Sequence, residues 1–150
     1  MSNKIKQVIV AAGPVIIEEG RVLLNKHGDD KFWKFLGGRV ESEDSSDATM
    51  SLENACKREV KEENGFAIDI VCPLKPMMIP KPNSDGVYVV LIHFLAKRLG
   101  DIKLGDDIED FQEFDIEKLI AGKYAGEEFA PNIVPVLQSY LDLKKKGFPV

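Results

Sequence analysis

The chain has 150 residues and a formal net charge of −5, and 44% of its residues are hydrophobic and 30% charged. These values predict a soluble globular protein organised as one domain over residues 1–150. The acidic balance gives no evidence for nucleic-acid binding, which usually shows a basic surface. An acidic protein that handles anionic phosphates needs a cation between the two.

Neither the apolar segments nor the cysteines point to a membrane or an oxidising compartment. The longest apolar runs, residues 8–10 and 87–92, are far too short to span a bilayer. The first residues lack the apolar stretch of a signal peptide. Cys56 and Cys72 are too few for a disulfide framework and have no metal-site spacing, so we expect both to be reduced. The expected location is the cytoplasm.

The first part of the chain alternates Val- and Ile-rich segments with turn residues, which predicts strands joined by tight turns. Glu19 and Gly20 form a turn signal, so the two segments that flank them are expected to pair as a hairpin. An aromatic-rich segment follows and runs into Gly37 and Gly38. The three predicted strands are residues 7–18, with an interruption at Gly13 and Pro14, residues 21–25, and residues 31–36.

A polar loop over residues 39–50 is expected to lead into a central helix over residues 51–64, with Gly65 at the position of a C-cap glycine. Strands, one central helix, more strands and a last helix follow one another, which predicts an α/β sandwich with a mixed sheet. The remaining predicted elements are strands 66–78, 87–96 and 111–114, an acidic loop 99–110, and helices 115–120 and 132–146.

The predicted central helix carries glutamates on its apolar side. At about 100° per residue, Glu59 and Glu63 fall beside Leu52 and Cys56, and Glu62 lies at the edge of the same face. The lysines fall on the opposite face. A charge run on a solvated helix surface would show the reverse arrangement, so this run is expected to have another role.

Three carboxylates close together near the C-terminus of a helix repel one another. Each anion there costs about 0.3–1 kcal/mol because of the helix dipole. Arg58 can offset part of this cost through an i,i+4 pair with Glu62. A divalent cation would offset the rest, and hard oxygen ligands in this arrangement favour Mg²⁺ or Mn²⁺.

The same residues form a motif. Gly38, Asp44 and the segment Arg58-Glu59-Val60-Lys61-Glu62-Glu63-Asn64-Gly65-Phe66 resemble the box of the Nudix hydrolase family, G-x5-E-x7-R-E-U-x-E-E-x-G-U, where U is a bulky apolar residue. Residues 58–66 match every specified position. Asp44 stands where the family has glutamate. Thirteen residues, 45–57, separate it from Arg58 where the pattern has seven, so six residues are inserted.

The resemblance covers most of the chain and implies a Nudix-like α/β/α sandwich with a pyrophosphohydrolase activity. The expected reaction is metal-dependent cleavage of a phosphoanhydride in a small nucleotide, a nucleoside diphosphate linked to another group. By this resemblance Glu59 and Glu63 bind the principal Mg²⁺ or Mn²⁺, with the Gly37 carbonyl as a further ligand. Glu62 binds a second ion or deprotonates water, and Arg58 orients a glutamate.

Other residues are weaker candidates for the site. Family members often take another acidic group from a later loop, and Glu109 is the favoured candidate here, although a solvated turn explains it equally well. Phe32 and Trp33 could stack on a base, and Lys26 and Arg39 could contact phosphates. The competing interpretations are ordinary packing for the aromatic pair and ordinary surface charge for the cations.

Two functions of other classes fit the same sequence. The insertion and Asp44 permit a catalytically silent Nudix-fold module that binds a nucleotide without turnover. A structural domain with an incidental acidic helix is the third interpretation. Neither the substrate nor the oligomeric state can be read from the sequence.

Overall fold

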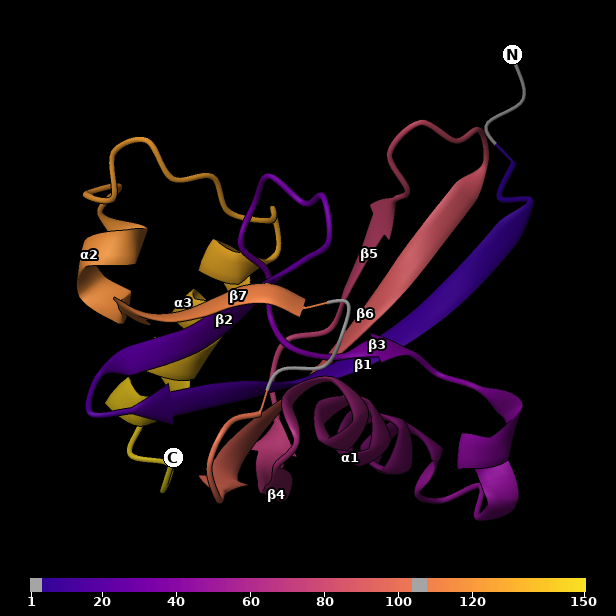
Figure 1. Ribbon diagram of the computed structural model, residues 1–150, viewed down its shortest axis with the longest axis horizontal. Helices are drawn as coiled ribbons and strands as arrows, with labels where there is room; N and C mark the ends of the chain where they lie inside the picture. The colour runs from indigo at the N-terminus through magenta and orange to yellow at the C-terminus, as the bar shows by residue number, and fades with distance from the viewer. Residues whose placement is uncertain (1–3, 104–107) are drawn as a thin grey trace.

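The computed structural model describes residues 4–103 and 108–150 and, within that part, all side chains except those of residues 108 and 109 (Figure 1). The strands are β1 (Gln7–Glu18), β2 (Arg21–His27), β3 (Gly38–Arg39), β4 (Ala67–Pro73), β5 (Met77–Pro80), β6 (Val87–Leu99) and β7 (Ile108–Asp115). The helices are the 3-10 helix η1 (Ser42–Ser46), α1 (Ser51–Asn64), α2 (Ile116–Ile120) and α3 (Ile133–Lys145).

One mixed sheet contains these strands in the order β4-β6-β1-β2-β7, with β3 paired to β1 and β5 paired to β6. The two longest strands, β1 and β6, run parallel, with Gln7 opposite Val87 and Ile16 opposite Ala96. The other pairings are antiparallel, including the predicted hairpin of β1 and β2. The predicted α/β class and mixed sheet are therefore confirmed.

Helices cover both faces of the sheet, so the core is split into two clusters. Successive side chains of a strand point to opposite faces, and neighbours such as Val15 and Ile16 accordingly belong to different clusters. Figure 1 shows α1 on one side of the strands and α3 on the other. The α1 cluster includes Ile16, Leu23, Ala55, Cys56, Val60 and Phe94, and the α3 cluster includes Val15, Leu24, Phe114, Ile133 and Leu137.

Helix α1 has the bounds that the sequence predicts. Cys56 and Val60 are fully buried against the sheet, whereas Lys57 and Lys61 are exposed. The helix ends at Gly65, whose φ of 73° is the left-handed conformation of a C-cap glycine. In the described part of the chain, no helix combines the length and apolar character that a membrane crossing requires.

Four sequence-based predictions of strands need correction. The interruption predicted at Gly13 and Pro14 is absent, because β1 continues through both residues. Residues 31–36 form no strand, because Trp33 and Lys34 make only isolated bridges to other segments. The predicted strand 66–78 is split into β4 and β5, since Pro73 at the end of β4 and Pro76 between the two strands cannot donate to a continuous ladder. The last strand, β7, begins at Ile108, earlier than the predicted residue 111.

Candidate active site

The carboxylate of Glu59 is held against the backbone where β3 begins. Glu59 is 8% exposed, although it is a charged residue on a helix. A Cβ atom built on Gly38 would lie 2.5 Å from Glu59 Oε2, so only glycine leaves room for this carboxylate. Gly37, with φ of 127°, and Gly13 make a similarly close backbone contact on the neighbouring strand β1. The three glycines therefore let the backbones of β1 and β3 approach each other closely and leave room for the Glu59 carboxylate beside them.

Arg58 is the centre of an ion-pair network that joins η1 to α1. Its Nε and Nη2 donate to the two oxygens of Asp44 at 2.8 and 2.9 Å, a bidentate contact. Its Nη1 donates to Glu59 at 2.9 Å and to Glu62 at 3.2 Å, and Nη2 also donates to the Arg39 carbonyl oxygen at 3.1 Å. The guanidinium holds the pKa of the buried Asp44 carboxyl below its usual value. Arg58 therefore fixes the orientation of Glu59 and ties Asp44 of η1 to α1.

The three glutamates of the box differ in their exposure. The Glu63 side chain is 12% exposed, whereas that of Glu62 is 59% exposed. Burial raises the pKa of Glu59, and the nearby Glu63 carboxyl raises it further, while Arg58 acts in the opposite direction. Glu59 and Glu63 thus form a crowded, buried anionic pair, and Glu62 stands at its edge.

His27, at the end of β2, faces this pair. Its Nε2 lies 3.2 Å from Glu63 Oε2, yet neither atom has a hydrogen-bond partner and both are buried. The pairing of β2 with β7 shifts register here, from Lys26 opposite Asp110 to His27 opposite Ile108. Such a bulge re-aims the neighbouring side chain. Sequence reasoning missed His27, because the contact depends on a register shift between strands that lie far apart in the sequence.

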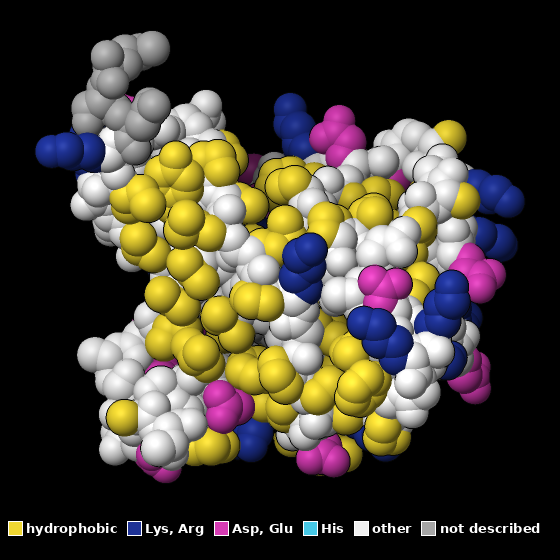
Figure 2. Space-filling model, turned by 180° about the vertical axis from the view of Figure 1, so that it is seen from behind, with side chains coloured by type: hydrophobic (Ala, Val, Ile, Leu, Met, Phe, Trp, Pro, Cys, Tyr) yellow, Lys and Arg dark blue, Asp and Glu magenta, His cyan; other side chains and the backbone are white. Residues whose placement is uncertain are grey.

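A cavity of about 870 Å³ opens beside these residues. Its polar end is formed by Glu59, Glu63, His27 and the backbone of Gly37 and Gly38. An apolar part of the lining comes from β5, β6 and the loop between them. Figure 2 shows hydrophobic side chains gathered over the projecting end of these strands. The apolar residues of this part of the lining are Ile79, Pro80, Pro82, Val89, Leu91 and Ile92.

Two of the four predicted substrate-binding residues line the cavity, and two do not. Phe32, which is 37% exposed, and Arg39 both contribute to its wall. Trp33 is only 3% exposed and packs edge-on against Phe114 in the α3 cluster, with ring centroids 5.1 Å apart. The Lys26 ammonium lies 4.5 Å from the centre of the Trp33 ring. Neither Trp33 nor Lys26 is among the residues that line the cavity. Trp33 packs in the core, as the alternative interpretation for the aromatic pair has it, and a role for either residue in the site stays a prediction.

Other residues that line the cavity were not predicted to have a role in the site. His93 donates from Nδ1 to the Lys75 carbonyl oxygen at 2.8 Å, and its Nε2 accepts from the Asn132 amide at 2.9 Å. Burial lowers the pKa of His93, so the ring is neutral at pH 7. Lys34 also lines the cavity, where its ammonium pairs with Asp30 at 2.6 Å. These residues come from separate segments, which no local motif links.

Glu59 and Glu63 are the residues that could hold a divalent cation at this site. Within residues 4–103 and 108–150, no three His, Cys, Asp or Glu side chains converge on one point. The Glu59–Glu63 pair, with the unpartnered and buried Oε2 of Glu63, nevertheless supplies the hard anionic oxygens that Mg²⁺ or Mn²⁺ takes. Water and substrate oxygens usually complete such a sphere. The pair therefore fits a cation that is shared with a ligand.

The predicted further acidic residue, Glu109, cannot be placed in the site. Its backbone lies in β7, where the register shift opposite Lys26 and His27 leaves it without a paired residue. Its side chain lies outside the part of the structure that is described, as do Asp106 and Asp107 entirely. The assignment of Glu109 stays a prediction.

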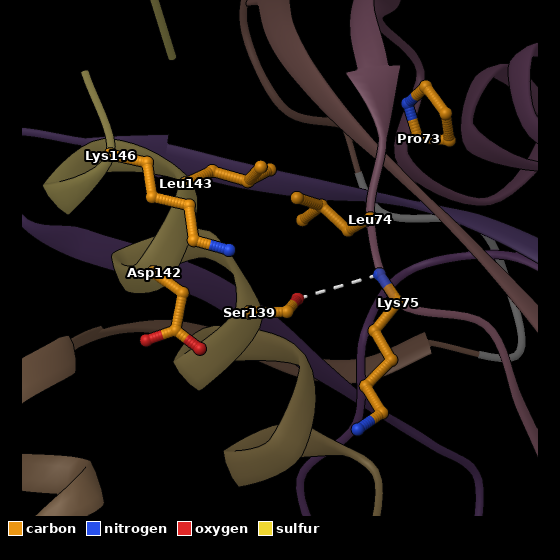
Figure 3. Close-up of a pocket in the computed structure, with 7 residues that line it drawn as sticks. All are labelled: Pro73, Leu74, Lys75, Ser139, Asp142, Leu143 and Lys146. Carbon is orange, nitrogen blue, oxygen red and sulfur yellow. Dashed lines mark hydrogen bonds between the residues drawn. The ribbon is translucent and has the colours of Figure 1, made fainter. Parts of the chain in front are cut away.

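A second, smaller cavity of about 310 Å³ lies beside α3, away from the carboxylate pair (Figure 3). Leu74 and Leu143 face each other across it, and the backbone N–H of Lys75 donates to Ser139 Oγ at 3.5 Å. Asp142 is the one acidic residue among its described lining residues. This cavity lacks the paired carboxylates of the larger one, so the larger one is the candidate active site.

Comparisons with known proteins agree with the geometry. A family model described as the NUDIX domain matches residues 6–137. A curated relative, an ADP-ribose pyrophosphatase of Methanocaldococcus jannaschii, is 27% identical over 113 residues, which cover 73% of this chain and 63% of the relative. The matched segment thus spans less than two thirds of that relative.

Solved structures share the fold at low sequence identity. The ORF135 protein of E. coli is 19% identical with a TM-score of 0.73, and the alignment covers 96% of both chains. A MutT NUDIX hydrolase from Burkholderia pseudomallei is 22% identical with a TM-score of 0.71, over 89% of this chain and 98% of that one. The family model spans most of the chain and matches the box that places Glu59 and Glu63 at the cavity. The chain therefore belongs to the Nudix family.

Proposed function

We propose that this enzyme hydrolyses a phosphoanhydride bond in a nucleoside diphosphate linked to a second group, with a divalent cation held at Glu59 and Glu63. The observation that carries the proposal is the buried pair of carboxylates at the polar end of a cavity of about 870 Å³. The negative charge of a diphosphate needs to be neutralised, and the proposed cation at Glu59 and Glu63 would do this. A base or sugar needs a less polar surface, which β5 and β6 provide.

The bound ion would neutralise charge on the diphosphate oxygens and lower the pKa of a bound water molecule. The protein's own residues do the positioning. Arg58 Nη1 donates to Glu59 Oε1 at 2.9 Å and keeps this carboxylate turned toward the start of β3. The carbonyl of Gly37, which lines the same cavity, is the proposed backbone ligand. Mg²⁺ and Mn²⁺ are the two proposed ions, because the glutamate and carbonyl oxygens are hard ligands.

Glu62 has a different proposed role, because its side chain is mostly exposed and reaches the solvent side of Arg58 at 3.2 Å. From that position it can accept a proton from an attacking water or take part in binding a second ion. Arg39 and Phe32, on the cavity wall, are the proposed contacts for phosphate and base. A flat base on the half-exposed Phe32 ring would gain from stacking.

The name of the Methanocaldococcus relative suggests which substrate to test first. We propose a nucleoside diphosphate sugar such as ADP-ribose, ahead of nucleoside triphosphates and dinucleoside polyphosphates. A cytoplasmic location is also proposed, since Cys56 and Cys72 are both free thiols and such thiols are usual in a reducing compartment.

The test is a panel of these nucleotides with Mg²⁺ or Mn²⁺, in which phosphate-containing products are separated by chromatography. We expect Glu59→Gln and Glu63→Gln to lower kcat by at least about 100-fold, the scale reported for losing a group that stabilises transition-state charge. Glu53→Gln is the matched control, because it makes the same change on the same helix but outside the cavity lining. Equal turnover by the wild type and both site variants would contradict the proposal. Nucleotide binding without turnover would instead identify a silent module.

A further inference from the structure

The contact between His27 and Glu63 is not that of an ordinary hydrogen-bonded pair. The two atoms, Nε2 and Oε2, lie 3.2 Å apart, and each is removed from solvent. The two atoms lie within ion-pair distance, a contact that attracts only when the imidazole is protonated, and neither atom makes a hydrogen bond. With a neutral imidazole, both buried polar atoms therefore lack a partner. Buried polar atoms are almost always paired, and an orphaned pair therefore calls for a missing partner.

The separation of these two atoms matches two neighbouring ligands of one metal ion. Nitrogen and oxygen ligands lie about 2.1 Å from small divalent ions. Two such ligands at a right angle are then about 3 Å apart, close to the distance between His27 Nε2 and Glu63 Oε2. Both residues line the cavity whose polar end also holds Glu59. An ion placed beside this pair would satisfy both orphaned atoms at once.

His93, the other histidine, cannot act as a ligand of this ion. The chain has two histidines, and both ring nitrogens of His93 are already engaged, by the Lys75 carbonyl and the Asn132 amide. The free nitrogen of His27, in contrast, points at a carboxylate of the box. The bulge between Lys26 and His27 is the local feature that turns it there.

We propose that His27 is a nitrogen ligand of the ion bound at Glu63, so that the site prefers Mn²⁺ over Mg²⁺. This inference rests on the proposed function, because it concerns the ion that the hydrolysis needs. Imidazole is a borderline donor that suits transition metals, whereas Mg²⁺ favours oxygen. The carboxylate pair alone would not discriminate between the two ions in this way.

The experiment measures ion binding rather than turnover. The purified protein is loaded with Mn²⁺, and electron spin echo envelope modulation reports whether an imidazole nitrogen is coupled to the ion. We expect this coupling in the wild type and its loss in His27→Gln. In calorimetry, we expect His27→Gln to weaken Mn²⁺ binding by at least about tenfold, the lower end of the loss typical of removing even an outer ligand partner. Mg²⁺ affinity should change much less.

Lys26→Gln is the matched control, since residue 26 is the neighbour of His27 but lies over the Trp33 ring, away from Glu63. It should retain both the nitrogen coupling and the Mn²⁺ affinity. Circular dichroism shows whether each variant is folded. Because His27 is at the end of a strand and partly exposed, its substitution should leave the fold intact.

The outcomes separate this inference from the proposed function. Mn²⁺ bound without nitrogen coupling in the wild type would overturn the role of His27 and leave the hydrolase proposal standing. Nitrogen coupling in a protein that hydrolyses none of the panel would support His27 as a ligand and contradict the hydrolase proposal. Failure to bind Mn²⁺ or Mg²⁺ at all would overturn both.

Discussion

At the scale of single residues, the site places the carboxylates of Glu59 and Glu63 close together and largely away from water, where an ionised carboxylate opposes folding. Glu59 is almost fully buried, and its pKa is raised by burial and by Glu63. A raised carboxyl pKa means that the folded state binds the proton more tightly than the unfolded state. Above the ordinary glutamate pKa of 4.5 the ionised side chain therefore opposes folding, and this cost grows as the pH rises through the folded pKa.

We therefore predict that Glu59→Gln makes the metal-free protein more stable at pH 7 while removing its activity. The gain should be about 0.5–2 kcal/mol, which is common when a functional site is relieved of its strain. Thermal unfolding in the presence of a chelator measures it. Glu53→Gln, on the same helix, should leave stability nearly unchanged. A lower melting temperature for Glu59→Gln would show that its ion pair with Arg58 outweighs the cost of burial.

The sequence could predict which box residues turn inward, but not all of their partners. The helical wheel placed Glu59 and Glu63 beside the apolar residues; in the structure Glu59 is buried, and the Glu63 side chain is 12% exposed. It gave Glu62 an edge position, and that side chain is mostly exposed. The contact of Asp44 with Arg58 could not be predicted, because thirteen residues separate the two and distance along the sequence does not show how the segment between them folds back. In space, its carboxylate receives two hydrogen bonds from Arg58.

At the scale of elements, the end of α1 sets the position of the carboxylates. Gly65 closes the helix in the left-handed conformation, and its N–H donates to the Val60 and Lys61 carbonyls at 3.1 Å. A further hydrogen bond links the C-terminal end of α1 to the segment after β6, because the Lys103 N–H donates to the Asn64 carbonyl oxygen at 2.6 Å. Glu63 stands directly before this closure, so its placement depends on it.

We predict that Gly65→Ala destabilises the protein by about 1–2 kcal/mol, the cost of an L-residue in the left-handed region. A Cβ atom there would also lie 2.8 Å from Lys103 Cβ, which requires the segments to move apart. Urea unfolding measures the loss. Gly122→Ala is the control for backbone strain alone, because Gly122 has a similar φ of 71° with open space around it. An equal loss in both variants would exclude a contribution from the Lys103 contact.

The elements with strong local signals could be predicted, and those defined by distant pairing could not. Helix α1 and its C-cap follow from a helical pattern that ends in glycine. Residues 31–36 have the aromatic content of a strand, yet Trp33 is used as a core side chain against Phe114. The chain there makes single bridges to β2 and to Phe129 instead of a ladder. The aromatic composition of residues 31–36 indicates that this segment is partly buried, but it does not show which segment of the chain it packs against or pairs with.

At the scale of the whole molecule, His93 links three separate parts of the chain. It lies on β6, donates to the connection between β4 and β5 at Lys75, and accepts from Asn132 at the start of α3. Burial lowers the pKa of His93 below its usual 6.5. As the pH falls below 6.5, the unfolded chain takes up a proton that the folded protein refuses, so stability is lost between 6.5 and the folded pKa.

We predict that wild-type stability declines over this interval by up to about 1.4 kcal/mol per pH unit from His93, the value for one proton. His93→Gln should be less stable at pH 7, because two buried hydrogen bonds are altered, and its stability should depend less on pH. Denaturant unfolding between pH 7 and pH 5.5 measures both slopes. His27→Gln should keep the wild-type contribution of His93. Identical slopes for the wild type and His93→Gln would contradict the prediction.

The parallel pairing of β1 with β6 also affects how the protein is made. Gln7 pairs with Val87, so eighty positions separate the partners along the chain. At about 5–20 residues per second, a ribosome needs roughly 4–16 s to deliver the second strand after the first. During that interval β1 can pair only with β2 and the short β3, and its other edge, which β6 later covers, stays open. We therefore expect the nascent chain to be most prone to aggregate before residue 99 has been synthesised, and to gain most from a chaperone at that stage.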